Sequence, residues 1–551
     1  MSDPIEHAAQ LAAARDALSI RGLKHAAVFA CELYASLPES ARENLPLTPE
    51  DRAPSDGLLF LAKSYFDLQE YARASHVLAQ KESLSDVEFF VMHYARYLAG
   101  ERRKEQLSLE MKANSGSAQK PTTNPNLKDL MRDLSDADAV GKLDAFGLYL
   151  YGVVLKESRV HLTPSGTSPQ QIFWRSIARF PWNWSAWLEV SNMKAPILDK
   201  SVVCPWMADF FQAHVLLIQS QVPQAIDILE RLKSTFPSSG YVVSQLARAN
   251  YELRDFDGAN DLFQQLTAAD PYRMELMDLY SDVLYVREDK TALSELAHHV
   301  QAVDKYCPET NCVIGNYYAL KGQHERAIAY FTRAISLDNE CLAAWTLIGH
   351  EYIQMKNTNA AIEVYRRALE LAQNDYRAWY GLGQAYELLD LYHYSIYYYQ
   401  KAAAIRPYDA RMWVALGGSF EKLGQMNQAK VCYLRAVGNK DAEGIAVFRL
   451  AKLYEVSEKD MDKAAEYYRM HWRDRTLRGV TRVDTTDAVQ AVLFLGKFCM
   501  QRGELPEAMQ WCNKLLERDG PEKEEAKAML HAMRQMEFST PETRHTGRNY
   551  F

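Results

Sequence analysis

One pattern recurs every 34 residues over seven consecutive copies, and this repetition constrains the fold more than any other feature of the chain. The copies start at residues 206, 240, 274, 308, 342, 376 and 410, and an eighth starts at 444 with one extra residue. A copy of this length is too short to bury an apolar face alone, so successive copies must stack on one another. The sequence therefore predicts a solenoid.

Small and bulky residues alternate at fixed positions of each copy. Positions 4, 11 and 24 carry aromatic residues in most of the later copies, as Trp345, Tyr352 and Tyr365 do in the fifth. Position 8 is always small: Ala213, Ala247, Ser281, Gly315, Gly349, Gly383, Gly417 and Ala451. A helical glycine costs about 1 kcal/mol relative to alanine, so four in register indicate two closely crossing helices. The pattern is that of the tetratricopeptide (TPR) unit, with antiparallel helices A and B. It predicts an all-α TPR superhelical solenoid of roughly twelve to thirteen helix pairs.

The regularity of the repeat predicts how the chain is divided. We expect N-terminal TPR units in 1–111, a flexible loop at 112–126 and irregular TPR units in 127–205. Seven regular units fill 206–443, followed by C-terminal units with a capping helix in 444–537 and a tail in 538–551. The copy at 274–307 is the weakest, because Met277, Leu293 and Ala297 stand where aromatic or small residues are usual.

Composition excludes several classes of protein. Charged residues make up 24% and hydrophobic residues 48% of the chain, as in ordinary soluble proteins. A net charge of −8 gives no support to nucleic-acid binding. The sequence shows neither a run of 18 apolar residues nor a signal peptide at its start, so we expect no membrane association. Eight scattered cysteines suit reduced thiols in the nucleus or the cytoplasm.

Catalytic motifs are absent from the sequence. It contains no HExxH, GxxxxGK[ST] or GxSxG motif and no metal-spaced cysteine pairs. Cys307 and Cys312 lack a second pair, and Gly381 and Gly383 fall inside a predicted helix rather than in a phosphate-binding loop. We therefore expect a protein that is not an enzyme and that needs neither a cofactor nor a metal.

Recognition of another polypeptide remains as the function. In a TPR unit, positions 2, 5, 9 and 12 of helix A lean toward the concave groove. These positions supply the candidate peptide-binding residues Asn316, His350, Tyr380, Gln384, Glu387, Glu421 and Glu455. Three carboxylates on successive units favour an extended peptide that carries arginine. The alternative is a solvated helix face, neutralised by neighbours such as Arg377, Arg411 and Lys422.

Two further features of the sequence can be interpreted in more than one way. Five of the ten tryptophans lie between 174 and 206, where they serve either a protein interface or the joint between irregular units. Four Ser/Thr-Pro pairs in predicted loops are weak candidates for phosphorylation: Thr48, Thr163, Ser168 and Thr540.

Several segments of the regular block resemble one TPR family. They are residues 311–331, 344–352, 376–387, 397–402 and 406–409, and they include the run Gly-Asn-Tyr-Tyr at 315–318 and the tyrosines near 397. The resemblance is to subunit 8 of the anaphase-promoting complex, or cyclosome, known as the cell-division-cycle protein 23 family. It is close over about 300–437 and weaker in the first 200 residues.

The resemblance implies a scaffold in a multisubunit ubiquitin ligase that acts in the cell cycle. It also implies a homodimer formed by N-terminal repeats within residues 1–205, with 1–111 as the homodimerisation region. Further implications are contacts with sibling TPR subunits and an arginine-bearing motif of an activator subunit in the groove. The alternatives are another TPR subunit of the same complex or a co-chaperone adaptor. Asn316 fits the clamp of such an adaptor, whereas Glu387, Glu421 and Glu455 oppose the acidic peptide that it would bind. On this hypothesis, Glu421→Lys weakens binding of an arginine-bearing peptide without lowering thermal stability.

Overall fold

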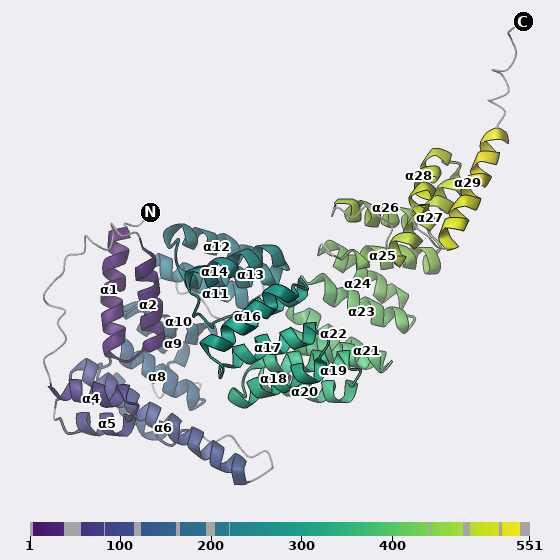
Figure 1. The fold of residues 1–551 in the computed structure, drawn as a ribbon. Coiled ribbons are helices and arrows are strands. Elements are labelled where there is room, and N and C mark those ends of the chain that lie inside the picture. Colours follow the sequence, from purple (N-terminus) through teal and green to yellow (C-terminus); the bar gives the residue numbers. More distant parts are fainter. Residues whose placement is uncertain are drawn as a thin grey trace, which may run out of the picture. The chain divides into compact units, whose positions relative to one another are not determined.

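The computed structural model describes residues 4–37, 57–81, 83–114, 123–160, 166–193, 204–219, 221–439, 441, 443–477, 485–516 and 521–539. Within these ranges every regular element is a helix (Figure 1), which confirms the predicted all-α TPR fold. No helix of the described ranges combines the length and the apolar character needed to cross a membrane. The chain forms two compact units, residues 1–287 and 288–551.

Antiparallel helix pairs occupy the regular block. Six of the seven A helices begin at or within one residue of a predicted repeat start. The pairs are α11 (Pro205–Ile218) with α12 (Val222–Thr235), α13 (Gly240–Leu253) with α14 (Phe256–Ala269), α15 (Met277–Val286) with α16 (Lys290–Val303), α17 (Pro308–Leu320) with α18 (His324–Leu337), α19 (Leu342–Gln354) with α20 (Thr358–Leu371), α21 (Tyr376–Leu388) with α22 (Tyr392–Ile405), and α23 (Ala410–Lys422) with α24 (Met426–Gly438). Helix α15 belongs to the weak copy and starts late, after Leu276 with a φ of 61°.

The small residue at position 8 lets helix A approach the aromatic ring at position 24 of helix B. A Cβ atom added to Gly349 would lie 2.4 Å from the ring of Tyr365. The corresponding distance is 2.5 Å from Gly383 to Tyr399 and 2.6 Å from Gly417 to Tyr433. These contacts are too close for any side chain on helix A, which explains the glycines in register.

Nine helices precede the regular block. They are α1 (Pro4–Ile20), α2 (Lys24–Ser36), α4 (Gly57–Asp67), α5 (Tyr71–Ala79), α6 (Asp86–Asn114), α7 (Leu127–Ala139), α8 (Ala145–Glu157), α9 (Pro169–Arg179) and α10 (Trp184–Ser191), counted within the described ranges. Helix α6 continues to Asn114 and so includes the first three residues of the segment 112–126 that was expected to be a loop; residues 115–122 lie outside the described ranges. The chain that follows these residues is held against α6. Buried Asn124 donates from Nδ2 to the Tyr97 carbonyl oxygen at 3.1 Å and to Glu101 at 2.8 Å.

The N-terminal pair α1–α2 packs against helices that follow it by more than 150 residues. Phe29 of α2 stacks on Trp184 of α10 with ring centroids 4.8 Å apart. Glu32 Oε1 accepts a hydrogen bond from the backbone N–H of Tyr241 at 2.6 Å and lies 3.3 Å from Arg273 Nη1. Trp184, Trp187 and Trp206 are buried in this core. These three tryptophans therefore pack a joint, as one of the two interpretations expected.

The C-terminal helices follow the same plan with one irregularity. They are α25 (Ile445–Leu453), the π-helical turn η2 (Tyr454–Glu458), α26 (Met461–Leu477), α27 (Thr486–Arg502), α28 (Leu505–Leu515) and α29 (Pro521–Ser539). Helix α29 packs on α27 and α28 in the place of the expected capping helix. Among the candidate phosphorylation residues, Ser168 caps helix α9 through its hydroxyl, and Thr48, Thr163 and Thr540 lie outside the described ranges.

Candidate functional site

The three predicted glutamates share one arrangement. Each carboxylate accepts a hydrogen bond from the hydroxyl of a tyrosine at position 24 of its own unit. The pairs are Tyr399 with Glu387 at 2.7 Å, Tyr433 with Glu421 at 2.8 Å, and Tyr468 with Glu455 at 2.8 Å. We call Glu387, Glu421 and Glu455 the glutamate row.

The small residue at position 8 makes these hydrogen bonds possible. The rings of Tyr399, Tyr433 and Tyr468 are buried between helices A and B. In the first two units the ring crosses a glycine, so its hydroxyl emerges at position 12 of helix A. The tyrosine thereby fixes one carboxylate oxygen while the carboxylate keeps contact with solvent, since 31% of the Glu421 side chain is exposed.

The extra residue of the eighth unit is absorbed at Glu455. It widens the end of helix A into the π-helical turn Tyr454–Glu458. Tyr468 is therefore 13 residues from its glutamate, whereas the other two pairs are 12 residues apart, and the hydrogen bond is unchanged. Single π-helical turns of this kind occur frequently at functional sites.

The phenols of these pairs stay protonated and donate to the carboxylates. Burial raises the pKa of Tyr399, Tyr433 and Tyr468 far above its ordinary value, and the neighbouring glutamate raises it further. A neutral donor satisfies part of a carboxylate without cancelling its charge. The glutamate row therefore keeps the negative charge that a cationic ligand needs.

One member of the row has an ion pair with a neighbouring cation, whereas Arg411 is engaged elsewhere. Arg411 pairs with Asp409 at 2.8 Å rather than with a member of the row. Glu421 forms a long ion pair with Arg449, whose Nη1 atom lies 3.9 Å from Oε1. Across the described part of the chain, no lysine or arginine forms an ion pair with Glu387 or Glu455.

The other four predicted residues lie on three consecutive A helices: Asn316 on α17, His350 on α19, and Tyr380 and Gln384 on α21, which also carries Glu387. Consecutive A helices are in contact, α17 with α19 and α19 with α21. Asn316 is buried in α17, and Gln384 is half-buried in α21. Tyr380 packs against Tyr399 with ring centroids 5.3 Å apart, beside the hydroxyl that holds Glu387.

His350 repeats the tyrosine arrangement in a different form. Its Nδ1 atom lies 2.9 Å from the hydroxyl of Tyr365, the tyrosine at position 24 of that unit. Burial and, to a smaller extent, the positive charge of Arg377 together lower the pKa of His350 to about 4. The imidazole is therefore neutral near neutral pH and shares a hydrogen bond with the Tyr365 hydroxyl.

Two polar features escaped the sequence analysis. Glu351 is buried beside His350, and its Oε2 atom lies 2.7 Å from Nδ1 of His324 on the preceding helix B. Burial raises the pKa of Glu351. The second feature is the tyrosine hydroxyl itself. Three units with tyrosine at position 24 have glutamate at position 12, and the unit of Phe331 has Ala319 there. Because the unit of Tyr365 has Ile353 at position 12, the co-occurrence of tyrosine and glutamate was only a partial signal in the sequence.

One group of possible metal ligands occurs in the described residues, and an arginine occupies it. Cys499, Glu504 and Glu507 bring ligand atoms within 4.8 Å of one another. Arg469 lies 3.1 Å from Glu507 and 3.7 Å from Glu504, and it also donates to the Cys499 sulfur at 3.6 Å. The guanidinium satisfies this group without an ion, so the group offers no support for a metal site.

Two kinds of protein-family model match the chain, one specific to a single family and the others general to TPR repeats. The model of anaphase-promoting complex subunit 8 / Cdc23 matches residues 6–247. General TPR models match 308–341, 349–390, 410–442 and 475–523. The family-specific match thus falls on the N-terminal part, where sequence reasoning found the resemblance weaker.

Individual relatives agree with the family model. Anaphase-promoting complex subunit 8 of Arabidopsis thaliana is 46% identical over 501 residues, covering 90% of this chain and 84% of that protein. The subunit 8 of Dictyostelium discoideum is 41% identical and covers 85% of each chain. The human cell division cycle protein 23 homolog is 40% identical over 51% of this chain and 47% of its own length.

Among solved structures, the fold is similar to that in the crystal structure of the APC/C hetero-tetramer Cut9-Hcn1. The TM-score is 0.55 over 95% of each chain, at 16% identity. At that identity the likeness supports the fold alone.

Proposed function

Because the chain belongs to the family of anaphase-promoting complex subunit 8, also called Cdc23, we propose that it is a non-catalytic TPR scaffold subunit of the anaphase-promoting complex. In this role it holds sibling TPR and scaffold subunits together and supports cell-cycle-regulated ubiquitination. The alternatives, another TPR subunit of the complex or a co-chaperone adaptor, fit less well. The relatives carry the name of subunit 8, and an adaptor groove for acidic peptides needs cations where this chain has the glutamate row.

We further propose that the glutamate row binds an arginine-bearing motif of an activator subunit. The single observation that carries this proposal is the recurrence of the Tyr–Glu hydrogen bond in three consecutive units. A carboxylate fixed on one side by a phenol presents its remaining lone pairs in a defined direction. It loses less conformational entropy on binding a guanidinium than a freely rotating side chain does.

Arginine suits this arrangement better than lysine. A guanidinium presents several donors in one plane, so it bonds to a carboxylate in a fixed orientation and stacks on aromatic faces such as that of Tyr380. Tyr380 is half-buried and packs beside the tyrosine that holds Glu387. The row therefore favours an extended peptide with arginine over the same peptide with lysine.

The experiment compares Glu421→Gln with the unsubstituted full-length chain. The glutamine side chain still accepts the Tyr433 hydrogen bond but lacks charge, so we expect about tenfold weaker binding of an arginine-bearing activator peptide, with thermal stability nearly unchanged. Fluorescence anisotropy at low and high salt measures the affinity. Glu325→Gln removes an exposed carboxylate from helix B of another unit and serves as the matched control.

The structure also revises the expectation for Glu421→Lys. That change removes the acceptor of the Tyr433 hydroxyl, which is buried with its ring. Loss of the bond costs about 1 kcal/mol, so Glu421→Lys lowers stability as well as affinity. Equal binding by the Glu421→Gln variant and the unsubstituted chain would refute the arginine-binding role of the row.

Two further proposals, on the oligomeric state and on the location in the cell, rest on membership of the family. We propose a homodimer formed through residues 1–205 and a location in the nucleus and the cytoplasm. Analytical ultracentrifugation of the full chain over a range of concentrations tests the dimer, and a monomer at every concentration would contradict it. Imaging of a tagged chain in dividing cells tests the location.

A further inference from the structure

A second charged feature runs along the B helices of the unit 288–551. Position 26 carries a cation in four consecutive repeats: Arg333 on α18, Arg367 on α20, Lys401 on α22 and Arg435 on α24. We call these residues the basic row. They share one repeat position, so each occupies the same face of its helix.

Three members of the row lie over aromatic rings instead of pairing with carboxylates. Arg435 lies 4.7 Å from the ring centroid of Trp413, Lys401 lies 5.7 Å from that of Tyr397, and Arg333 lies 5.7 Å from that of Tyr306. Within the described ranges, no carboxylate comes within ion-pair distance of these three cations. A ring below a cation orients it but leaves its charge in place. The three cations are therefore held in position and available to an external anion.

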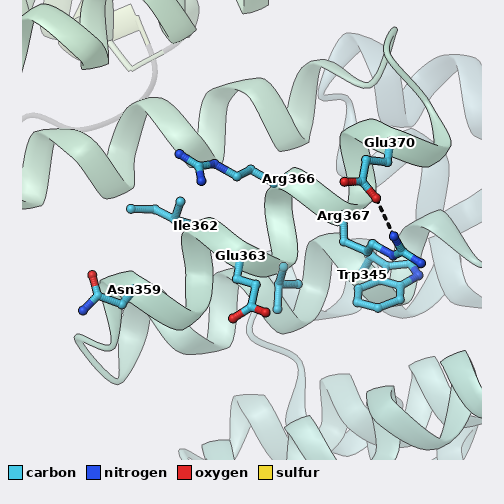
Figure 2. Close-up of a pocket in the computed structure, with 8 residues that line it drawn as sticks. Trp345, Asn359, Ile362, Glu363, Arg366, Arg367 and Glu370 are labelled. Carbon is cyan, nitrogen blue, oxygen red and sulfur yellow. Dashed lines mark hydrogen bonds and ion pairs between the residues drawn. The ribbon is translucent and has the colours of Figure 1, made fainter. Parts of the chain in front are cut away.

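The fourth member is locally neutralised. Arg367 forms an ion pair with Glu370 at 2.5 Å, next to Trp345 (Figure 2). Both side chains are more than half exposed. An exposed pair of this kind contributes at most about 1 kcal/mol, so a competing carboxylate can displace Glu370.

Grooves accompany the row at equivalent places in two units. One groove, with a volume of about 690 Å³, is lined by Trp345, Asn359 and Arg367 (Figure 2). The other, with a volume of about 630 Å³, is lined by Trp413, Asn427 and Arg435. These residues occupy positions 4, 18 and 26 in both units. Each groove thus combines an indole ring, a side-chain amide and a guanidinium. The first groove also contains Glu363 and Glu370, whereas no carboxylate of the described residues lines the second, so the second is better suited to an acidic residue next to an apolar one.

The surrounding charge favours an acidic ligand. By side-chain count, with histidine neutral, α20 carries no net charge, whereas α18 and α22 each carry one net positive charge and α24 carries two. The whole chain, in contrast, has a net charge of −8. Positive charge on these helices is therefore a local feature rather than a consequence of composition.

We propose that the basic row is a docking surface for an acidic, extended segment of a partner polypeptide that has apolar side chains between its carboxylates. The row belongs to B helices, whereas the glutamate row belongs to A helices, so this proposal is independent of the one for arginine-bearing peptides. Neighbouring B helices are separated by one A helix, which places their axes at most about 20 Å apart. An extended chain covers that distance in about six residues.

The test measures binding of a labelled peptide to the full-length chain by fluorescence anisotropy. The peptide carries a pair of glutamates and a tyrosine about every six residues, and a second peptide has glutamine in place of every glutamate. We expect the acidic peptide to bind, and binding to weaken as salt rises because exposed charges are screened. The triple variant Arg333→Ala, Lys401→Ala, Arg435→Ala is expected to bind it about tenfold more weakly.

A matched variant separates the basic row from general positive charge. Lys321→Ala, Arg326→Ala, Lys422→Ala removes the same number of exposed cations from other repeat positions. It is expected to bind the acidic peptide as the unsubstituted chain does. Equal losses in the two triple variants, equal binding of the glutamine peptide, or no binding to the unsubstituted chain would overturn the proposal. Tighter binding of a single-stranded DNA of the same charge would also overturn it, because it would assign the row to nucleic acid.

Discussion

Single residues in this chain act through the partners that the repeat brings to them. A tyrosine at position 24 is buried in every unit of the glutamate row, yet its hydroxyl reaches the other helix and fixes a glutamate there. In the unit of Tyr365 the same hydroxyl meets His350 instead. One core position thus holds a polar side chain of helix A in place, whether that side chain is glutamate or histidine.

His350 should make its unit sensitive to acid. Its pKa is lowered to about 4 in the folded state, against about 6.5 when unfolded. Between these values the unfolded chain binds more protons, so stability falls as pH decreases through this window. We expect a loss of about 2 kcal/mol between pH 7.5 and pH 5. Hydrogen exchange of α19 and α20, corrected for intrinsic rates, measures it.

The control for this prediction is His350→Gln. Glutamine retains an acceptor for Tyr365 but does not titrate, so protection of α19 and α20 should depend less on pH in the variant. The same fall in protection in both proteins would show that another group is responsible.

The distance between the two helices of a pair depends on glycine. Gly417 and Gly418 are adjacent on α23 but have opposite surroundings. A Cβ on Gly417 would lie 2.6 Å from the ring of Tyr433, whereas a Cβ on Gly418 would meet nothing within 4 Å. The first glycine is required by packing against α24, and the second only weakens the helix.

Alanine at these neighbouring positions should therefore change stability in opposite directions. Gly418→Ala is expected to stabilise the chain by about 1 kcal/mol through helix propensity. Gly417→Ala gains the same propensity but forces Tyr433 away, and overpacking of this kind costs about 1–3 kcal/mol, so a net loss is expected. Denaturant unfolding of the two variants provides the comparison. Stabilisation by both substitutions would contradict the close approach.

The chain as a whole contains contacts that a simple stack of neighbours does not require. Within the unit 1–287, the pair α1–α2 packs against α10 and α13, far along the sequence. Phe29 is the centre of this contact, with Trp184, Phe210 and Tyr241 around its ring. These rings, with Glu32, hold the N-terminal pair in place.

Phe29→Ala should release that pair while leaving the regular repeats folded. Truncation of a buried phenylalanine costs about 3–5 kcal/mol, and the loss falls on one contact surface. Limited proteolysis is expected to cleave near α1–α2 first in the variant, with protection of 308–438 unchanged. Val28→Ala is the control, because that neighbouring side chain is 63% exposed. Global unfolding of the Phe29 variant would contradict this view.

The repeat period determined the fold class, the regular helix pairs and the candidate residues at positions 5, 9 and 12, because 34-residue spacing and helical geometry place equivalent residues on equivalent faces. Local pattern also showed that the eighth unit has one extra residue, and the structure placed that residue in the π-helical turn Tyr454–Glu458. Only the tertiary structure showed that Tyr433 crosses Gly417 to bind Glu421, that Glu351 is buried against His324, and that α1–α2 returns to Trp184. These contacts join residues on different helices, and their partners depend on how the helices cross and on which side chains fill the space between them. A periodic pattern specifies which residues share a face of a helix, whereas packing decides which side chains touch between two helices.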